Sequence, residues 1–313
     1  MSIGDRDNSE CAHFSQSLGL SFDSVSHIQT NAYCAIYQTI ANGTPYIVKA
    51  YRSDDPRLMI AEAKALDFYH EIASERTNLI DSRAVARNDA ENLLCIQYVP
   101  GERLSDLIYQ GKHNLETRAR TLRIMRTLGA VLNTFYNRTA QPDAEMDAFP
   151  FEYFTYCSKR LEALPILGRV WFRRYEASGA ALAEAFRAAR LTPSFAHGDL
   201  VFRNIHVDGE RVGLIDFANT NFGSHLLNDG YNLLFALSNM ILSRSYRADL
   251  REALRQGVGG LSFPDIGHRF YYEYHRRRWL LLKLNSSSLG DLFQVIRGLG
   301  GFARSSDRSF IRL

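Results

Sequence analysis

The sequence predicts an α+β protein with a β-rich N-terminal lobe, which holds one main helix, and a larger, mostly helical C-terminal lobe. Before Pro100, short runs rich in β-branched and aromatic residues dominate the chain, whereas segments with helical spacing dominate after it. The sequence Pro-Gly-Glu at 100–102 breaks the pattern between the two. We therefore expect a flexible N-terminal tail over residues 1–20, which carry no periodic signal, an N-terminal lobe over 21–99 and a C-terminal lobe over 100–313.

The N-terminal lobe is predicted to contain five strands and one helix. Strands are expected at 21–30, 32–40 and 45–51, and Asn42-Gly43 between the last two is a strong hairpin signal. Pro56 suits the first turn of the helix that follows, and apolar residues then recur at helical spacing. Two more strands are expected near 83–88 and at 92–99.

The C-terminal lobe is predicted to be helical apart from one hairpin. Helical spacing is found near 115–137, 151–164, 170–190, 226–243, 247–256 and 264–284. The exception is 194–216, where Asp208-Gly209 separates two short apolar strands. The apolar stretch 231–242 is short and interrupted by Asn, which indicates a buried helix and not a membrane span.

Composition narrows the class of protein. A net charge of +3 over 313 residues argues against a nucleic-acid-binding protein that relies on bulk charge. The four scattered cysteines form no metal-ligand pattern and indicate reduced thiols, and the polar N-terminus is no signal peptide, so we expect a cytoplasmic protein. No transmembrane segment is expected, whereas peripheral membrane contact and the oligomeric state stay open.

Two polar motifs stand at the ends of predicted buried strands. HGDLVFRN occupies 197–204, and GLIDFA follows the hairpin at 213–218. Asp and Asn are poor strand and helix formers, so folding alone gives little reason for this concentration. Polar residues on loops held by buried strands are typical of catalytic sites.

With these motifs the chain resembles the aminoglycoside phosphotransferase and choline kinase family of the protein-kinase-like superfamily. Loops of this family read HGD or HND followed by Asn, and then IDF or IDW. The resemblance implies a bilobal protein-kinase-like fold and ATP-dependent phosphoryl transfer to a hydroxyl group with Mg²⁺. It runs from about the first strand to the 226–243 helix.

Several polar residues in and after the two motifs have candidate roles, most of which the resemblance implies. Asp199 would be the catalytic base or would orient the acceptor hydroxyl, and Asn204 and Asp216 would bind Mg²⁺. His197 would support the loop. Arg203 would offset phosphate charge or form a surface salt bridge. Asp229, further along, would brace the loop or cap a helix.

The resemblance also implies a nucleotide site in the N-terminal lobe. Lys49 would contact the α- and β-phosphates, and Glu62 on the next helix would pair with it. The backbone at Gln97 and Val99 would recognise adenine. The loop at 28–35 lacks the Gly-rich pattern of protein kinases, so Asn31 and the backbone of Ala32 are the candidates for covering the phosphates.

Departures from protein kinases favour a small-molecule acceptor. DFA stands at 216–218, no long activation segment follows, and Val201 lies where protein kinases have a Lys. The stretch 270–284 is either an amphipathic helix with Arg outside or an aromatic wall with cations, and its few carboxylates favour a sugar, polyol or saccharide-containing acceptor over a quaternary amine. A Ser/Thr protein kinase, a non-catalytic nucleotide-binding pseudokinase and nucleotidyl transfer are the alternatives.

Overall fold

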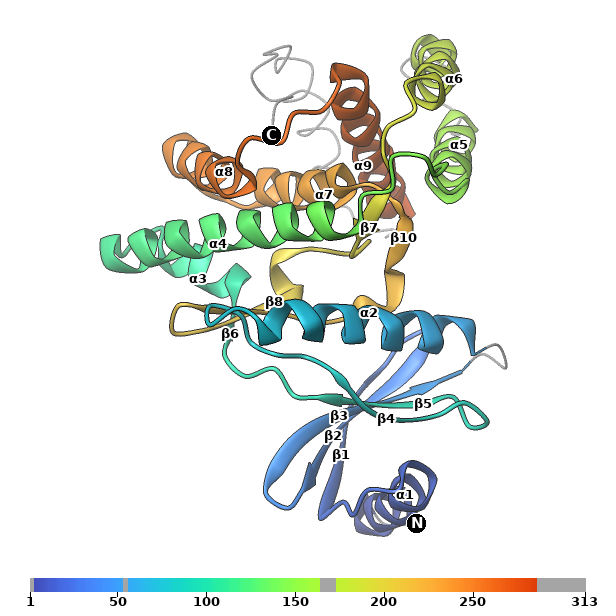
Figure 1. Cartoon of the computed structure of the whole chain (residues 1–313), viewed down its shortest axis with the longest axis vertical. Helices are drawn as coiled ribbons and strands as arrows, with labels where there is room; N and C mark the ends of the chain where they lie inside the picture. Colours follow the sequence, from blue (N-terminus) through green and yellow to red (C-terminus); the bar gives the residue numbers. More distant parts are fainter. Residues whose placement is uncertain (1–2, 53–55, 164–172, 286–313) are drawn as a thin grey trace. The chain divides into compact units, whose positions relative to one another are not determined.

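The computed structural model of the chain describes residues 3–52, 56–163 and 173–285, and its elements are drawn in Figure 1. The chain divides into two compact units, which are described separately. Unit 1 comprises Met1–Ile124 and His197–Thr220, and unit 2 comprises Met125–Ala196 and Asn221–Leu313. The mixed α+β composition, with the larger antiparallel sheet near the N-terminus and most helices near the C-terminus, confirms the predicted fold class.

Unit 1 is built on a five-stranded antiparallel sheet. Its strands β1 to β5 have the order β1-β2-β3-β5-β4 and span Ser24–Thr30, Cys34–Ala41, Thr44–Tyr51, Ala84–Asn88 and Leu93–Gln97. The predicted hairpin between β2 and β3 is confirmed, because Ala41 pairs with Thr44 around a two-residue turn. Asn42 and Gly43 both adopt positive φ, 50° and 73°, as the favoured hairpin turns require.

Two helices of unit 1 lie on opposite faces of this sheet (Figure 1). Helix α2 (Arg57–Ser74) buries Met59, Glu62, Leu66 and Tyr69, which recur at the three- and four-residue spacing of one helix face. Successive side chains of a strand alternate between faces, so Val48 points toward helix α1 (Ile3–Leu18) while Lys49 points toward α2. This alternation places Lys49 beside α2.

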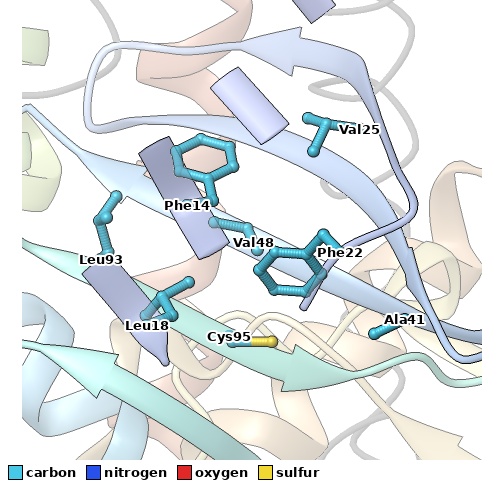
Figure 2. Packing of buried hydrophobic residues seen from close by; sticks show 8 residues of the cluster. All are labelled: Phe14, Leu18, Phe22, Val25, Ala41, Val48, Leu93 and Cys95. Carbon is cyan, nitrogen blue, oxygen red and sulfur yellow. The ribbon is translucent and has the colours of Figure 1, made fainter. Parts of the chain in front are cut away.

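The expectation of a flexible tail over residues 1–20 is wrong, since helix α1 occupies most of that segment. Phe14 and Leu18 of α1 are 3% and 8% exposed and pack on the sheet with Val48 and Leu93, as Figure 2 shows. Cys11 packs against the same cluster. The apolar positions 11, 14 and 18 follow a helical spacing, but they are too few among polar neighbours to stand out without the sheet that buries them.

The rest of unit 1 carries the two polar motifs. The short strands β6 (Glu102–Arg103), β8 (Ile205–Asp208) and β9 (Arg211–Leu214) form a sheet of order β6-β8-β9. Helix α3 (Leu104–Gln110) and the first part of α4 (Leu115–Thr139) complete the unit. The two units group residues that lie close together in space. The predicted boundary at Pro100 instead marks the change from strand-like to helix-like sequence. That lobe boundary stays a prediction.

Unit 2 is mostly helical. It holds the rest of α4 and the helices α5 to α9, at Phe149–Glu162, Arg173–Ala188, Leu226–Asn239, Arg244–Val258 and Asp265–Asn285. Strands β7 (Ser194–Ala196) and β10 (Asn221–Ser224) pair antiparallel. The predicted helices are found at these places, while residues 164, 170–172 and 286–313 of the sequence expectations lie outside the described residues. Among the residues described, no helix is both long enough and apolar enough to cross a membrane.

Helix α9 is an interior helix in which two arginines are buried as well. Phe270 and Tyr271 are fully buried, and the Phe270 ring stacks on Phe186 with centroids 4.1 Å apart. The expectation that the arginines of this helix face outward is wrong for Arg276 and Arg277, which are 9% and 4% exposed. Both donate to Glu273, at 2.9 Å and 2.5 Å, and the Arg277 guanidinium also lies 4.6 Å from the Phe154 ring centroid. Pairing with one carboxylate and a ring face offsets the cost of burying these charges.

Candidate active site

The polar motif at 197–204 forms a tight loop whose geometry requires glycine at its second position. Gly198 has φ +80°, and a Cβ built there would lie 2.0 Å from the carbonyl oxygen of Asn219. A one-turn 3₁₀ helix, Phe202–Asn204, then leads into β8. The loop therefore lies directly against Asn219, the residue after the second polar motif.

Asn204 is turned so that its amide nitrogen faces back into the loop. Its Nδ2 donates to the backbone oxygen of Asp199 at 2.9 Å and lies 3.4 Å from Asp199 Oδ2. The amide oxygen of Asn204 therefore points away from Asp199. Arg203 reaches the same carboxylate at 3.4 Å, but the Arg203 side chain is 67% exposed, whereas that of Asp199 is 14% exposed.

His197 joins the two polar motifs. The imidazole is fully buried, its Nε2 lies 3.0 Å from the backbone oxygen of Ile215, and its ring centroid is 4.6 Å from that of Phe217. Burial lowers the pKa of His197, while Asp216 and Asp199 act in the opposite direction without reversing the shift. A neutral imidazole that donates to Ile215 fits this environment.

Lys49 joins both strand β3 and helix α2 to the second motif. Its Nζ donates to Glu62 Oε1 at 2.7 Å and to Asp216 Oδ1 at 2.8 Å. Burial alone would lower the pKa of Lys49, but attraction to Glu62 and Asp216 raises it well above its ordinary value. The ammonium group is therefore charged and nearly enclosed, with 5% of the residue exposed.

Glu62 is fully buried and accepts from three groups. Besides Lys49, the backbone N–H of Phe217 donates to Oε1 at 3.1 Å, and the hydroxyl of Tyr51 donates to Oε2. The Glu62 carboxylate thus ties α2 to strand β3 and to the residue after Asp216. Sequence reasoning missed Tyr51, although its place two residues after Lys49 on the same strand predicts that both side chains share a face.

Asp216 occupies a left-handed backbone conformation, with φ 66° and ψ 61°. The neighbouring Ile215 N–H donates to the backbone oxygen of Asn204 at 3.1 Å, so the backbone brings the two motifs side by side. Burial raises the pKa of Asp216, but Lys49 outweighs this effect and holds the pKa below its usual range. Asp216 is therefore a carboxylate at neutral pH, and 43% of its side chain is exposed.

Asn31 orders the turn between β1 and β2. Its side-chain oxygen accepts from the backbone N–H groups of Tyr33 and Cys34, both at 2.8 Å. The oxygen is thereby committed to the turn, which leaves the amide NH₂ of Asn31 and the exposed backbone at Ala32 to face a ligand. Asn31 replaces glycine as the residue that shapes this loop.

Gln97, the last residue of β5, and Val99, two residues later, each have one backbone group paired within the protein. The Gln97 N–H donates to the carbonyl of Arg83 at 3.0 Å, and the Val99 carbonyl lies 3.0 Å from Nδ1 of His206. The backbone groups of these two residues that those hydrogen bonds do not use are the carbonyl of Gln97 and the N–H of Val99. A carbonyl and an N–H two residues apart suit the edge of a purine.

Asp229 belongs to unit 2. It is 1% exposed and sits in the first turn of α7. The alternative that Asp229 caps this helix is wrong, because the N-cap is His225, whose Nδ1 accepts from the Leu227 N–H at 3.1 Å. Its bracing of the catalytic loop stays a prediction.

Together, the sheet with its covering helix, the buried Lys–Glu pair and the two polar loops after β7 and β9 define a protein of the kinase-like phosphotransferase class. The comparisons identify the family. The model of the phosphotransferase enzyme family matches residues 35–280, so the chain belongs to that family. The predicted resemblance is thus confirmed, as is the class of enzyme, a phosphotransferase with an alcohol group as acceptor.

Solved structures of several small-molecule kinases share this fold. A choline/ethanolamine kinase family protein from Mesorhizobium loti has a TM-score of 0.63 at 12% identity, with 99% of this chain and 97% of that chain covered. The amicoumacin kinase hAmiN, in complex with AMP-PNP, Ca²⁺ and Ami, has a TM-score of 0.62 at 14% identity, with 94% of this chain and 93% of that chain covered. The AMP-bound spectinomycin phosphotransferase has a TM-score of 0.57 at 13% identity, with 93% and 94% covered. The search of curated proteins produced no significant match.

Proposed function

We propose that this phosphotransferase moves the γ-phosphate of ATP to a hydroxyl of a small molecule, with Asp199 as base and Mg²⁺ held by Asn204 and Asp216. The observation that carries the proposal is Lys49, a charged and nearly enclosed ammonium group held at 2.7 Å by Glu62 and at 2.8 Å by Asp216. Buried charges with strongly shifted pKa values cluster at functional sites, and an ammonium group is suited to binding the phosphates of a nucleotide.

The nucleotide would bind along unit 1. Lys49 would contact the α- and β-phosphates, and the Val99 N–H and Gln97 carbonyl would hold the adenine edge, since their other backbone groups are paired within the protein. The turn shaped by Asn31 would cover the phosphates with the amide of Asn31 and the backbone of Ala32. Backbone donors at a turn suit phosphate oxygens because they need no charged side chain.

The donor set at the two loops fits Mg²⁺. Asn204 offers its amide oxygen because its amide nitrogen is bound to Asp199, and Asp216 offers a carboxylate held ionised by Lys49. One carboxylate and one amide, completed by phosphate oxygens and water, match the hard oxygen ligands that Mg²⁺ takes in nucleotide sites. When bound, the ion would neutralise charge on the β- and γ-phosphates.

Asp199 would act on the acceptor. Its carboxylate is 14% exposed and held by Asn204 and Arg203, both 3.4 Å from Oδ2. Such a group can orient the acceptor hydroxyl in line with the γ-phosphate and take its proton as the phosphoryl group is transferred. Arg203, with its exposed guanidinium, would offset negative charge on the phosphates.

The proposed acceptor is a sugar, a polyol or a saccharide-containing molecule. The stretch 270–284 provides no exposed aromatic wall at Phe270 and Tyr271, because both rings are buried. Exposed rings are found instead on α5, where Phe149 and Tyr156 are 58% and 50% exposed, and the Tyr153 ring between them stacks on each. Rings of this kind suit the apolar face of a sugar.

A screen for ATP consumption tests the proposal. Purified protein with Mg²⁺ and ATP is offered sugars, polyols, amino alcohols, aminoglycosides and casein, and the mass of each product is measured. A gain of one phosphoryl group on a small molecule supports the proposal. Phosphorylated casein alone would mean a protein kinase, a gain of an AMP unit would mean nucleotidyl transfer, and nucleotide binding without turnover would mean a pseudokinase.

A further inference from the structure

Tyr51 is a buried polar residue that the proposed mechanism does not use, and it lies next to the proposed nucleotide site. It ends strand β3 two residues after Lys49, so the two side chains lie on the same face of the sheet. Only 8% of Tyr51 is exposed. Its hydroxyl donates to Oε2 of Glu62.

The Glu62 carboxylate depends on Tyr51 for one of its two oxygens. Oε1 accepts from Lys49 Nζ at 2.7 Å and from the Phe217 N–H at 3.1 Å. Oε2 accepts from Tyr51, and Glu62 is fully buried, so water does not reach this oxygen. The Tyr51 hydroxyl therefore fixes the rotation of the carboxylate that holds Lys49.

We propose that Tyr51 is a positioning residue, which fixes Glu62 and through it sets Lys49 for the phosphates of the nucleotide. This inference rests on the proposed function, because it needs Lys49 to bind phosphate. Without the hydroxyl, Oε2 of Glu62 becomes a buried acceptor with its partner removed, and the carboxylate rotates to recover a donor. The Lys49 ammonium group then loses its fixed position.

Tyr51→Phe removes the hydroxyl and keeps the ring. Binding of AMP-PNP with Mg²⁺ is measured by calorimetry, and adenosine is measured in the same way as a ligand without phosphates. Because hydrogen bonds to charged groups are among the stronger ones, we expect Tyr51→Phe to weaken AMP-PNP binding by roughly 5- to 20-fold. The affinity for adenosine should change less than about twofold. A general defect in the fold would instead weaken the binding of both ligands.

Tyr37→Phe is the matched control. Tyr37 lies in the same sheet, packs on the opposite face with α1, and donates its hydroxyl to the Glu10 carboxylate at 3.3 Å. The Tyr37→Phe substitution thus removes a hydrogen bond of the same kind, from a tyrosine hydroxyl to a glutamate, but away from the site. Tyr37→Phe should bind AMP-PNP and adenosine as the wild type does.

A second measurement places the effect on Glu62. In the background of Glu62→Gln, which lacks the negative charge that holds Lys49, adding Tyr51→Phe should change AMP-PNP affinity by less than about twofold. Equal losses in both backgrounds would overturn the inference, and so would a Tyr51→Phe protein that binds AMP-PNP as tightly as the wild type. Failure of the wild-type protein itself to bind AMP-PNP would overturn the proposed function together with the inference.

Discussion

At the scale of single residues, the charged and amide side chains predicted for the site hold one another in place. Asn204 is bound to Asp199, Asp216 to Lys49, and Lys49 to Glu62. The contact between Lys49 and Asp216 joins residues 167 positions apart along the chain, so local spacing alone does not produce it. The roles of Asp199 and Asp216 lead to different measurements.

Asp199→Asn should separate catalysis from binding. The substitution keeps the shape and removes the charge, so the affinity for AMP-PNP should stay nearly unchanged while turnover falls by roughly 10²–10⁴-fold, the usual contribution of proton transfer. Calorimetry with AMP-PNP and initial rates with the acceptor found in the screen check this. A parallel loss of AMP-PNP binding would indicate that Asp199 is a metal ligand or a structural group. An unchanged rate would show that Asp199 is not the catalytic base.

Asp216→Asn should remove the dependence of nucleotide binding on Mg²⁺. In the wild type, chelation of Mg²⁺ should weaken AMP-PNP binding, because a carboxylate is the preferred hard ligand of the ion. The variant should bind equally weakly with and without Mg²⁺. Asp208→Asn is the control, since Asp208 lies in the adjacent hairpin with 46% of its side chain exposed, close to the 43% of Asp216. A variant at Asp216 that keeps the full effect of Mg²⁺ contradicts the assignment.

At the scale of elements, helix α1 is a part of unit 1 that the sequence did not predict. It covers the face of the sheet opposite Lys49 and packs against Val48, the residue immediately before Lys49 (Figure 2). Strand β3 is therefore held between an apolar contact on one face and an ion pair on the other. Docking of α1 stabilises the strand that carries Lys49 and Tyr51.

Phe14→Ala should lower the free energy of unfolding by about 3–5 kcal/mol, the usual cost of removing a buried Phe ring. The ring is 3% exposed and contacts Tyr37 edge-on, with centroids 5.0 Å apart. Urea unfolding of the variant checks this value. Gln16→Ala, at an exposed position of the same helix, should change the free energy by less than about 0.5 kcal/mol. Equal effects of the two substitutions would show that α1 does not dock on the sheet.

At the scale of the whole molecule, buried histidines make stability depend on pH. Burial lowers the pKa of His275 to about 3, with the charge of Arg278 adding to the shift and the hydrogen bond to Asn228 opposing it. Burial also lowers the pKa of His225 to about 3. Unfolded histidines titrate near 6.5, so below that pH the unfolded chain takes up protons that the folded protein does not bind. The contribution of these two histidines to stability is therefore fully present above pH 6.5 and is lost progressively as the pH decreases toward 3.

His275→Gln should reduce this pH dependence. Each such histidine costs about 1.4 kcal/mol per pH unit below 6.5, so between pH 7 and pH 5 the variant should lose roughly 2 kcal/mol less of its unfolding free energy than the wild type. Urea unfolding at the two pH values measures the difference. His113→Gln, at an exposed position, is the control and should lose as much as the wild type. A His275→Gln protein with the wild-type pH dependence would contradict the buried neutral imidazole.

The sequence by itself determined the features that depend on neighbours in the chain. Asn42-Gly43 specified its hairpin, the apolar residues at helical spacing after Pro56 specified helix α2, and the polar residues of 197–204 and 213–218 pointed to the two loops of the site. The buried face differs from the expected one at Ile60, which is 38% exposed. These signals are readable because turns and helices are set by backbone conformations over a few residues.

The packing of the folded chain was needed to show which polar side chains are buried and which partners they have there. It docked α1, buried Arg276 and Arg277 with their partner Glu273, and brought the Tyr51 hydroxyl to Glu62. In each case the outcome depends on burial and on the partner that burial supplies. A polar or charged side chain reads as exposed in sequence, and only the packing around it shows that its charge or hydrogen bond is met inside the protein.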